Sequence, residues 1–274
     1  MERQTFHKPD EIFKEVAEKL DQAASRDERV DYLSFVPDGE PTLDINLGRM
    51  IPHLRREGIP VAVFTNSSLI WQEDVQEDLL KADFVSLKVD TVSQDLWRRK
   101  NRPHAKLELR AILEGITAFV NEFRGTVVSE TMLLDGIDRK DEVEKIAVFL
   151  ADLRRLDKAY IAVPTKPPAQ RWVRPAKKEM IDSAYQLFSE RLGTDRVECL
   201  TGYEGDSFAF TGRVEEDLLG IMAVHPMRKE AVLKFLEKAN TNWCLVEKLL
   251  DEGRLVDLEY EGNTYYMKKL ASRR

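Results

Sequence analysis

The sequence predicts an α/β protein built on a parallel sheet with outer helices, and two observations carry this prediction. Short β-rich runs and helical apolar spacings alternate along most of the chain. Strict strand–helix alternation is typical of parallel sheets, open or closed into a barrel. The first recognisable element is a helix, so we expect a partial (β/α) barrel that lacks its first strand.

The helices are predicted from apolar positions that recur at a period of about 3.6 residues and from end signals. The first begins at Pro9 and carries Ile12, Phe13, Val16 and Leu20 on one face. Further helices are predicted at residues 46–57, 73–82, 107–123, 141–156 and 177–192. The strands are predicted at residues 32–36, 59–64, 84–89, 126–134, 159–163 and 197–201.

The pattern changes after Arg213, where a second domain is expected. Three short helices are predicted at residues 216–223, 228–238 and 243–251, and a hairpin at 255–260 and 264–269. This is the order of a winged helix, so we divide the chain into 1–212 and 213–274. Glu247, Asp251 and Glu252 make its third helix unsuitable for DNA phosphate, which favours a substrate- or partner-docking role.

Composition excludes several classes of protein. The formal net charge of −7 argues against a general nucleic-acid coat protein, although local basic patches remain compatible with it. No apolar run approaches the roughly 18 residues of a membrane span, and no secretory signal core follows Met1. Cys199 and Cys244 are isolated, which offers no metal-ligand spacing. We expect two buried thiols in a reducing cytoplasm.

The most informative stretch is YLSFVPDGEPTLD, residues 32–44. A β-rich run ends there in a Gly, a carboxylate and a Pro before a helix begins. Gly39 lets a ligand approach the backbone closely, and Pro41 fixes a turn. Glu40 then presents its oxygens at the carboxyl end of a strand, where parallel sheets bind ligands.

Other predicted strands also end in polar residues. Ser86, Lys88 and Asp90 alternate with apolar neighbours, and a period of two places all three on one side of the strand. A Lys in an apolar strand is costly unless Asp90 or a ligand carboxylate pairs with it. The alternative is a buried Lys–Asp pair that only holds the sheet in register.

Four motifs in this order resemble the radical S-adenosylmethionine (radical SAM) family. They are DGEPTLD at 38–44, FTNSS at 64–68, FVSLKVDT at 84–91 and SETMLLDGIDRKDEVEKIAVFL at 129–150. The resemblance is greatest to the branch that includes wyosine-type tRNA-modifying enzymes and extends over about residues 10–212.

The resemblance implies a site for SAM at the strand ends. Gly39 and Glu40 would meet its amino group, and Asp90 its ribose. Its carboxylate would meet Thr65, Asn66, Ser86 and Lys88, with Glu130 and Thr131 as weaker candidates in the same pocket. For each residue the alternative is an ordinary turn or cap role, which Asn and Ser at strand ends adopt often.

The family binds a 4Fe-4S cluster through a CxxxCxxC loop after its first strand, and this sequence contains no such motif. Cys199 and Cys244 cannot replace it, because a cluster needs several thiolates together. Three explanations stay open: a start codon assigned too late, a truncated sequence, or genuine loss of the cluster. We therefore assign no metal ligands or catalytic residues, and we expect weak SAM binding at best.

Two basic stretches with aromatic residues follow strand ends. One contains Trp97, Arg98, Arg99 and Arg102, and the other spans residues 166–174, from Lys166 to Arg174 with Trp172. Cations interleaved with aromatic residues suit an anionic substrate such as RNA or a nucleotide. A solvated loop is the alternative, and His104 beside Pro103 is interpreted as structural.

The leading hypothesis is the body of a radical SAM oxidoreductase or transferase. In the intact enzyme, a cluster and a reductant protein would cleave SAM to a 5′-deoxyadenosyl radical that modifies an unknown substrate. Two alternatives remain. One is an iron-independent barrel enzyme that uses Glu40, Lys88 and Asp90. The other is a non-catalytic binding or regulatory protein that acts through its winged helix.

Overall fold

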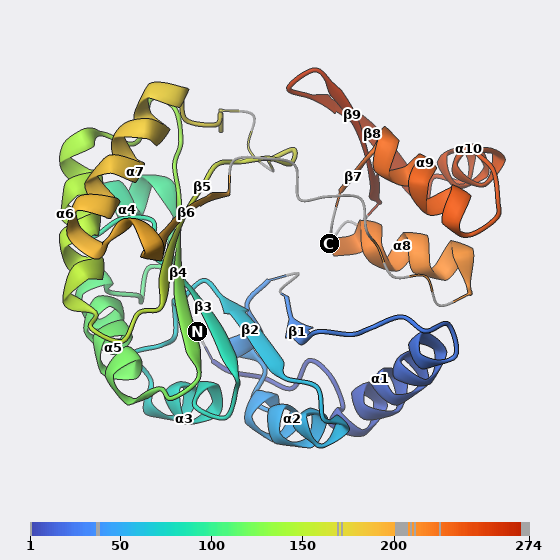
Figure 1. Cartoon of the computed structure of the whole chain (residues 1–274), viewed down its shortest axis with the longest axis horizontal. Coiled ribbons are helices and arrows are strands. Elements are labelled where there is room, and N and C mark those ends of the chain that lie inside the picture. The colour runs from blue at the N-terminus through green and yellow to red at the C-terminus, as the bar shows by residue number, and fades with distance from the viewer. Residues whose placement is uncertain are drawn as a thin grey trace. The chain divides into compact units, whose positions relative to one another are not determined.

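A six-stranded parallel sheet forms the centre of the larger part of the molecule (Figure 1). The computed structural model describes residues 2–36, 39–168, 170, 172–200, 208, 210, 212–224 and 226–269. The strands lie in chain order, which is the order of a barrel that has not closed. They are β1 (Leu33–Phe35), β2 (Val61–Thr65), β3 (Phe84–Lys88), β4 (Thr126–Met132), β5 (Lys158–Ala162) and β6 (Val197–Leu200).

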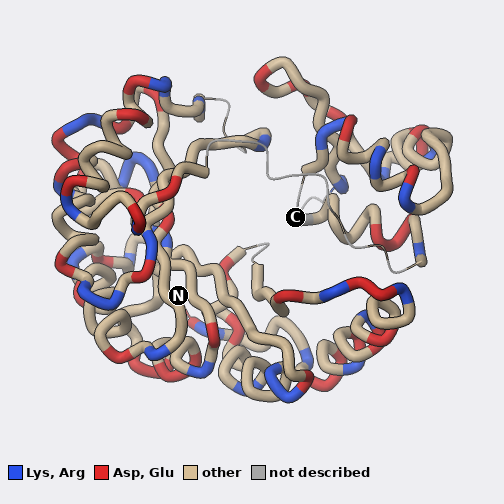
Figure 2. The backbone as a smooth tube through the Cα atoms, in the orientation of Figure 1, with Lys and Arg blue, Asp and Glu red and all other residues tan. Residues whose placement is uncertain are grey.

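Helices cover one face of this sheet. In Figure 1, α5, α6 and α7 lie along the same side of β4. The helices of this part are α2 (Leu47–Leu54), α3 (Glu73–Leu79), α4 (Gln94–Lys100), α5 (Leu109–Glu122), α6 (Lys140–Asp152) and α7 (Lys178–Leu192), with 3-10 turns at Pro41–Leu43, Arg55–Glu57 and Thr194–Arg196. Figure 2 shows most charges on helices and loops, as expected for a buried parallel sheet.

The two faces of the sheet differ in their side chains. On the helical face, Val61, Val63, Val85, Leu87 and Ile161 are at most 1% exposed. Burying each such side chain contributes roughly 1.5–3 kcal/mol. The alternate positions form the other face, which we call the open face. It carries Phe64, Phe84, Ser86, Lys88, Glu130 and Tyr160, and all except Ser86 are only half-buried.

A second compact unit contains the C-terminal residues. It comprises Lys14–Val30, Thr165–Arg171 and Gly202–Arg274. Its three-stranded antiparallel sheet has the order β7-β9-β8. The elements are α8 (Val214–Val224), β7 (Met227–Arg228), α9 (Lys229–Lys238), α10 (Cys244–Asp251), β8 (Leu255–Tyr260) and β9 (Asn263–Lys268). Phe235, Val246 and Leu255 lie in its core.

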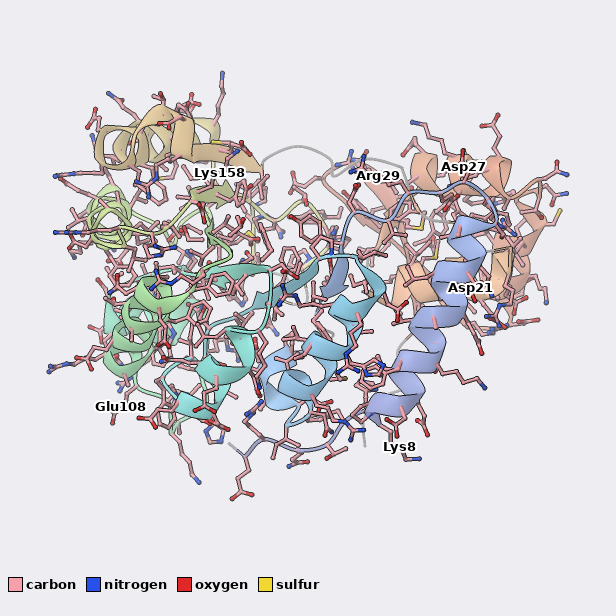
Figure 3. All side chains as sticks on the ribbon, turned by 60° about the horizontal axis from the view of Figure 1, so that its bottom comes forward. Lys8, Asp21, Asp27, Arg29, Glu108 and Lys158 are labelled. Atoms are coloured by element: carbon pink, nitrogen blue, oxygen red, sulfur yellow. The ribbon has the colours of Figure 1, made fainter. Side chains whose placement is uncertain are left out.

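Helix α1 (Pro9–Ala24) contributes to both units, because its residues from Lys14 onward group with the C-terminal unit. Figure 3 shows Lys8 before this helix and Asp21 along it, both exposed. Lys19 of α1 pairs with the buried Asp217 of α8 at 2.8 Å. The predicted boundary at residue 212 and the winged-helix interpretation stay predictions, since the unit also includes these earlier segments.

The predicted fold class is confirmed, and each of the six strands forms within a few residues of its predicted bounds. Two elements escaped prediction. Helix α4 lies in a stretch interpreted only as a basic loop, and β7 is two residues long. The predicted hairpin forms with Glu261 at φ 48° and Gly262 at φ 74° in its turn. Two positive φ values are typical of a type I′ turn.

The expectation of buried thiols is wrong, because Cys199 and Cys244 are both exposed. Cys199 lies on the edge strand β6, where only Val197 is buried. Cys244 begins α10, whose buried residues are Val246 and Leu249. None of the helices in the described part of the chain has the length and apolar character of a membrane span.

Helix α4 depends on a carboxylate from another helix. Glu142 of α6 accepts hydrogen bonds from Val92 N at 2.8 Å and Ser93 N at 3.0 Å, and also from the hydroxyls of Thr91 and Ser93. Burial would raise the pKa of Glu142, but these hydrogen bonds outweigh it and the pKa is lowered. Glu142 thereby fixes the segment that leads from β3 into α4.

We predict that Glu142→Gln lowers the free energy of unfolding at pH 7 by about 2 kcal/mol, since hydrogen bonds to charged groups are the strong ones. Because the folded pKa is depressed, the contribution is complete above the unfolded value near 4.5 and is lost as pH falls through the folded pKa. Urea unfolding at several pH values measures this. Glu144→Gln, at an exposed position of α6, is the control. The prediction is contradicted if the difference in unfolding free energy between Glu142→Gln and the unaltered chain stays the same as the pH is lowered.

A close approach of α5 to the chain before α3 requires a glycine. A Cβ at Gly115 would lie 2.7 Å from Trp71 Cα and 2.8 Å from Ile70 O. Gly220 in α8 has no atom within 4 Å of the same position. Both glycines lie inside helices, but only Gly115 lacks the space for a Cβ atom.

We predict opposite effects of the same substitution at these two sites. Gly115→Ala should destabilise by about 1–3 kcal/mol because backbone atoms cannot move aside. Gly220→Ala should stabilise its own unit by up to about 1 kcal/mol through helix propensity. Thermal and urea unfolding followed by circular dichroism compare the two, and a tolerated alanine at Gly115 would contradict the packing described.

Candidate functional site

A buried carboxylate joins the turn after β1 to the end of β2. Glu40 Oε1 accepts from Thr42 N at 3.1 Å, Thr42 Oγ1 at 2.7 Å and Thr65 Oγ1 at 2.6 Å. Its Oε2 accepts from Asn66 N at 2.7 Å. Glu40 is only 8% exposed. Among the described residues Oε2 accepts from one donor only, and because each carboxylate oxygen has about two lone-pair sites, Oε2 keeps capacity for one more donor.

Arg3, which no sequence pattern singled out, holds the same turn from its other side. The Arg3 guanidinium donates to Thr42 O at 2.9 Å and Asp44 O at 3.1 Å, and pairs with Asp74 and Asp78. Its side chain is 7% exposed. Gly39 has φ 155°, and a Cβ there would meet no atom of the described residues within 4 Å, its chain neighbours aside. Arg3 therefore fixes the turn at Thr42 and Asp44, and the turn is open at Gly39.

The loop after β2 contains a strained residue. Ser67 is fully buried with φ 63°, a left-handed conformation that is uncommon outside glycine. The hydroxyls of Ser67 and Ser68 are buried and have no hydrogen-bond partner among the described residues. Asn66 Oδ1 accepts from Ser68 N at 2.9 Å, so Asn66 does form a turn. Strain and orphaned polar atoms are features of ligand sites.

Lys88 pairs chiefly with a residue that was only a weak candidate. Its Nζ lies 2.5 Å from Glu130 Oε1 and 3.9 Å from Asp90 Oδ1. Lys88 and Glu130 are register partners on β3 and β4. Burial would lower the pKa of Lys88, but Asp90 and Glu130 outweigh it and hold the pKa above its usual value. Lys88 is therefore a protonated ammonium in an acidic cluster.

Asp90 is occupied by the surrounding backbone and side chains. Its Oδ2 accepts from Asn101 Nδ2 at 2.8 Å and its Oδ1 from Met132 N at 2.9 Å. Lys100 donates to Asp90 O at 3.0 Å and pairs with Asp138 at 2.8 Å. Burial raises the pKa of Asp138, against the opposing effect of Lys100. These bonds close the loop after α4 onto the ends of β3 and β4.

The structure places two predicted residues away from the open face. Thr131 is fully buried and donates to Val89 O at 2.8 Å. Thr65 alternates with Phe64 and uses its hydroxyl on Glu40. Ser86 shares the open face with Lys88, but it is 6% exposed. The geometry therefore joins Glu40 to Asn66 and joins Lys88 to Asp90 and Glu130. Asn66, Lys88 and Asp90 line one pocket.

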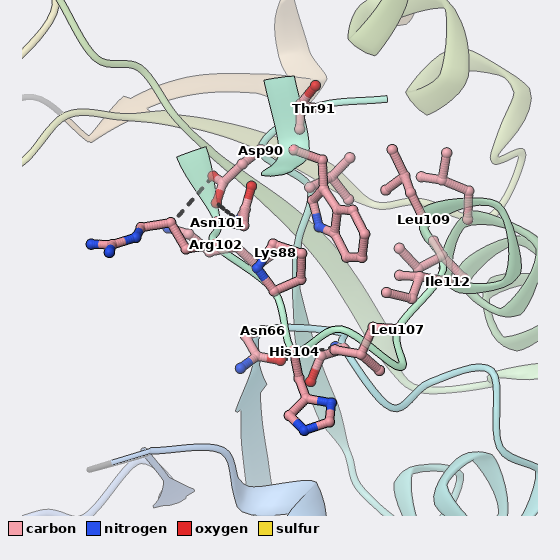
Figure 4. Close-up of a pocket in the computed structure, with 16 residues that line it drawn as sticks. Asn66, Lys88, Asp90, Thr91, Asn101, Arg102, His104, Leu107, Leu109 and Ile112 are labelled. Carbon is pink, nitrogen blue, oxygen red and sulfur yellow. Dashed lines mark hydrogen bonds and ion pairs between the residues drawn. The ribbon is translucent and has the colours of Figure 1, made fainter. Parts of the chain in front are cut away.

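A pocket opens beside these strand ends (Figure 4). It has a volume of about 260 Å³ and reaches from Asn66 and Lys88 toward α5. In Figure 4, Leu107, Leu109 and Ile112 lie on one side, and the Arg102 guanidinium lies on the opposite side. The cavity therefore has an apolar wall and a polar mouth.

The two basic stretches are only partly available for an anionic substrate. Lys100 is 3% exposed and paired with Asp138, whereas Arg98, Arg99 and Arg102 are exposed. In the second stretch, Arg171 and Ala169 lie outside the described residues, and Trp172 is 43% exposed.

The residues present do not fit an iron–sulfur cluster. The sequence contains two cysteines, and among the described residues no group of three His, Cys, Asp or Glu side chains could hold a metal ion. A four-iron cluster needs several thiolates in one place. Cys199 and Cys244 also belong to different units.

Comparison with known structures supports the fold. A radical SAM methyltransferase from Sphaerobacter thermophilus has a TM-score of 0.55 at 19% identity, over 73% of this chain and 59% of that chain. TYW1 with a lysine-pyruvate adduct bound has a TM-score of 0.50 at 14% identity, over 68% of this chain and 63% of that chain. At these identities the likeness concerns the fold alone.

Sequence comparison identifies the family of the chain. The UPF0026 protein MJ1312 of Methanocaldococcus jannaschii is 44% identical over all of this chain and 84% of that protein. The UPF0026 protein slr1464 of Synechocystis sp. is 36% identical over 52% of this chain and 54% of that protein, so the chain spans about half of this relative. The sequence model of the Radical SAM superfamily matches residues 2–150. The chain therefore belongs to the radical SAM superfamily.

Proposed function

We propose that this chain is the SAM-holding body of a radical SAM enzyme, with the cofactor at the carboxyl ends of β1 to β4. The observation that carries this proposal is the geometry around Glu40. A buried carboxylate with one unused acceptor position lies beneath an open glycine turn, at the strand ends where parallel sheets bind ligands. The ammonium group of SAM would supply the missing donor.

Electrostatics favour a cationic ligand at this site. Glu40, Asp90 and Glu130 contribute three formal negative charges and Lys88 one positive charge, a balance of −2. SAM carries an ammonium and a sulfonium against one carboxylate, so its net charge is positive. The arrangement therefore favours contact of the SAM cations with Glu40 and Glu130. A role for Lys88 toward the SAM carboxylate stays a proposal, since two carboxylates already surround its Nζ.

In the family, SAM supplies a 5′-deoxyadenosyl radical when a reduced cluster cleaves it. The ligands for that cluster are not among these 274 residues, so we assign no step of this chemistry to the chain. What its residues do is hold and orient the cofactor. Arg3 and Thr42 fix the turn, and Asp90 fixes the loop that borders the pocket.

The remaining proposals concern the substrate, the protein partner and the cellular compartment. We propose an anionic substrate near Arg98, Arg99 and Arg102, a reductant protein in the cluster-bearing enzyme, and work in the reducing cytoplasm. The two exposed cysteines are compatible with a reducing compartment, where unpaired thiols persist.

An iron-independent enzyme is the second candidate, and the structure gives one observation against its simplest form. A Schiff-base lysine must lose its proton, which requires a lowered pKa. The pKa of Lys88 is instead raised by Asp90 and Glu130. An acid–base role for these two carboxylates remains compatible with the geometry.

We predict weak binding of SAM to this chain, with a Kd of about 0.1–1 mM. Glu40→Gln should weaken SAM binding about five- to tenfold, because the amide loses the charge that attracts the ammonium. It should leave 5′-methylthioadenosine, which lacks that ammonium, within about twofold. Ligand-observed NMR titration of both compounds measures the two effects.

Glu57→Gln, on the exposed 3-10 turn before β2, is the matched control and should change neither titration. If Glu40→Gln lowers the affinities for SAM and for 5′-methylthioadenosine equally, Glu40 acts on the structure of the site and does not contact the SAM ammonium. Binding of SAM tighter than about 1 µM would contradict the expectation that affinity requires the absent iron.

A further inference from the structure

We propose a second ligand site in the pocket beside β3, which binds a small ring-bearing anion. The site lies between the ends of β2 and β3 and helices α4 and α5. It shares Asn66, Lys88 and Asp90 with the cofactor site at its mouth, but its wall belongs to the helical layer. The proposal does not depend on SAM binding.

The apolar wall fits a ring. It is formed by Val89, Trp97, Leu107, Leu109, Ile112, Leu113 and Ile116. The volume of about 260 Å³ exceeds the roughly 150 Å³ of an apolar cavity that accepts benzene. There is room for one aromatic ring and a short polar extension. Pockets with apolar walls and a few placed polar groups are the common form of small-molecule sites.

Polar groups at the pocket have unused hydrogen-bonding capacity. Ser68 Oγ is buried and has no partner among the described residues. Asn66 is exposed, and its Oδ1 is engaged by Ser68 N. The Ser68 Oγ is covered by protein atoms, so the donor that a ligand meets at this end of the pocket is the Asn66 Nδ2, which has no partner among the described residues.

Charge on the Arg102 side of the pocket, away from the carboxylates of the cofactor site, favours an anion. Residues 98–106 read RRKNRPHAK, which contains five basic residues and no acidic one. Asp138 neutralises Lys100, but Arg102 has no ion-pair or hydrogen-bond partner within the described parts of the chain. Both oxygens of Asp90 already accept hydrogen bonds from the protein. An anionic head group therefore meets the Arg102 guanidinium while its ring lies against the apolar wall.

Two matched probe pairs test the proposal and distinguish the source of the anion. The first pair is 3-phenylpropanoate and its neutral amide, and the second is uridine 5′-monophosphate and uridine. At least one anion should bind at least fivefold tighter than its neutral partner in NMR titration of the full chain. Its signal changes should include the Trp97 indole N–H, assigned with the variant Trp97→Phe.

Variants then locate the bound probe. Leu113→Trp, which fills the cavity, should reduce binding at least tenfold, whereas Leu233→Trp on the exposed surface of α9 should not. Arg102→Gln should reduce binding of the anion about tenfold and leave the neutral partner unchanged. Arg110→Gln, an exposed cation on α5, is its control.

Three results would overturn the proposal. They are the absence of binding by every probe at 5 mM, equal binding of anion and neutral partner, or signal changes that avoid Trp97. The Trp97 signal is measured on the unaltered chain, so the test holds even if Leu113→Trp fails to fold. If the chain binds a probe but does not bind SAM, the result contradicts the cofactor proposal and leaves the second site supported.

Discussion

The arrangement of the strand ends depends on the cost of burying Glu40. An ionised carboxylate at 8% exposure must find donors, and it finds them on the turn after β1 and on the end of β2. Arg3 holds the same turn from the opposite side through Thr42 O and Asp44 O. Two segments about 25 residues apart are thereby locked together at the sheet edge. Any ligand at this edge meets a fixed carboxylate.

A second set of carboxylates fixes the loops beyond β3. Asp90 joins Asn101 to Met132 N, Asp138 engages Lys100, and Glu142 caps the start of α4. Each is buried and accepts hydrogen bonds on its carboxylate oxygens, as a buried charge must. Together they leave an apolar pocket between α4 and α5 whose mouth opens at the strand ends. The hydrogen bonds of these carboxylates therefore stabilise the loops and also determine the shape of the pocket beside the candidate cofactor site.

Much of this could be predicted from local sequence. Alternating apolar positions and strand-ending glycines and carboxylates predicted six parallel strands, and DGEP identified Glu40. What failed depended on distant partners. Nothing near Arg3, Glu142 or Asp138 in the sequence shows which backbone groups they reach. Helix α4 was missed because its seven residues are mostly charged, although the buried Trp97 marks its inner side. Glu130 and Thr131 are neighbours on β4 and so lie on opposite faces, and the register with β3 decides that Glu130 is the one beside Lys88.

Hydrogen exchange of the chain with and without saturating SAM reports on the cofactor site at Glu40, because Thr42 N–H and Asn66 N–H donate to this carboxylate. We expect SAM to slow exchange at residues 40–46 and 65–68 and to leave exchange in the C-terminal unit unchanged. Protection confined to the C-terminal unit, or bound SAM without slower exchange in the two segments, would contradict a cofactor site built around Glu40.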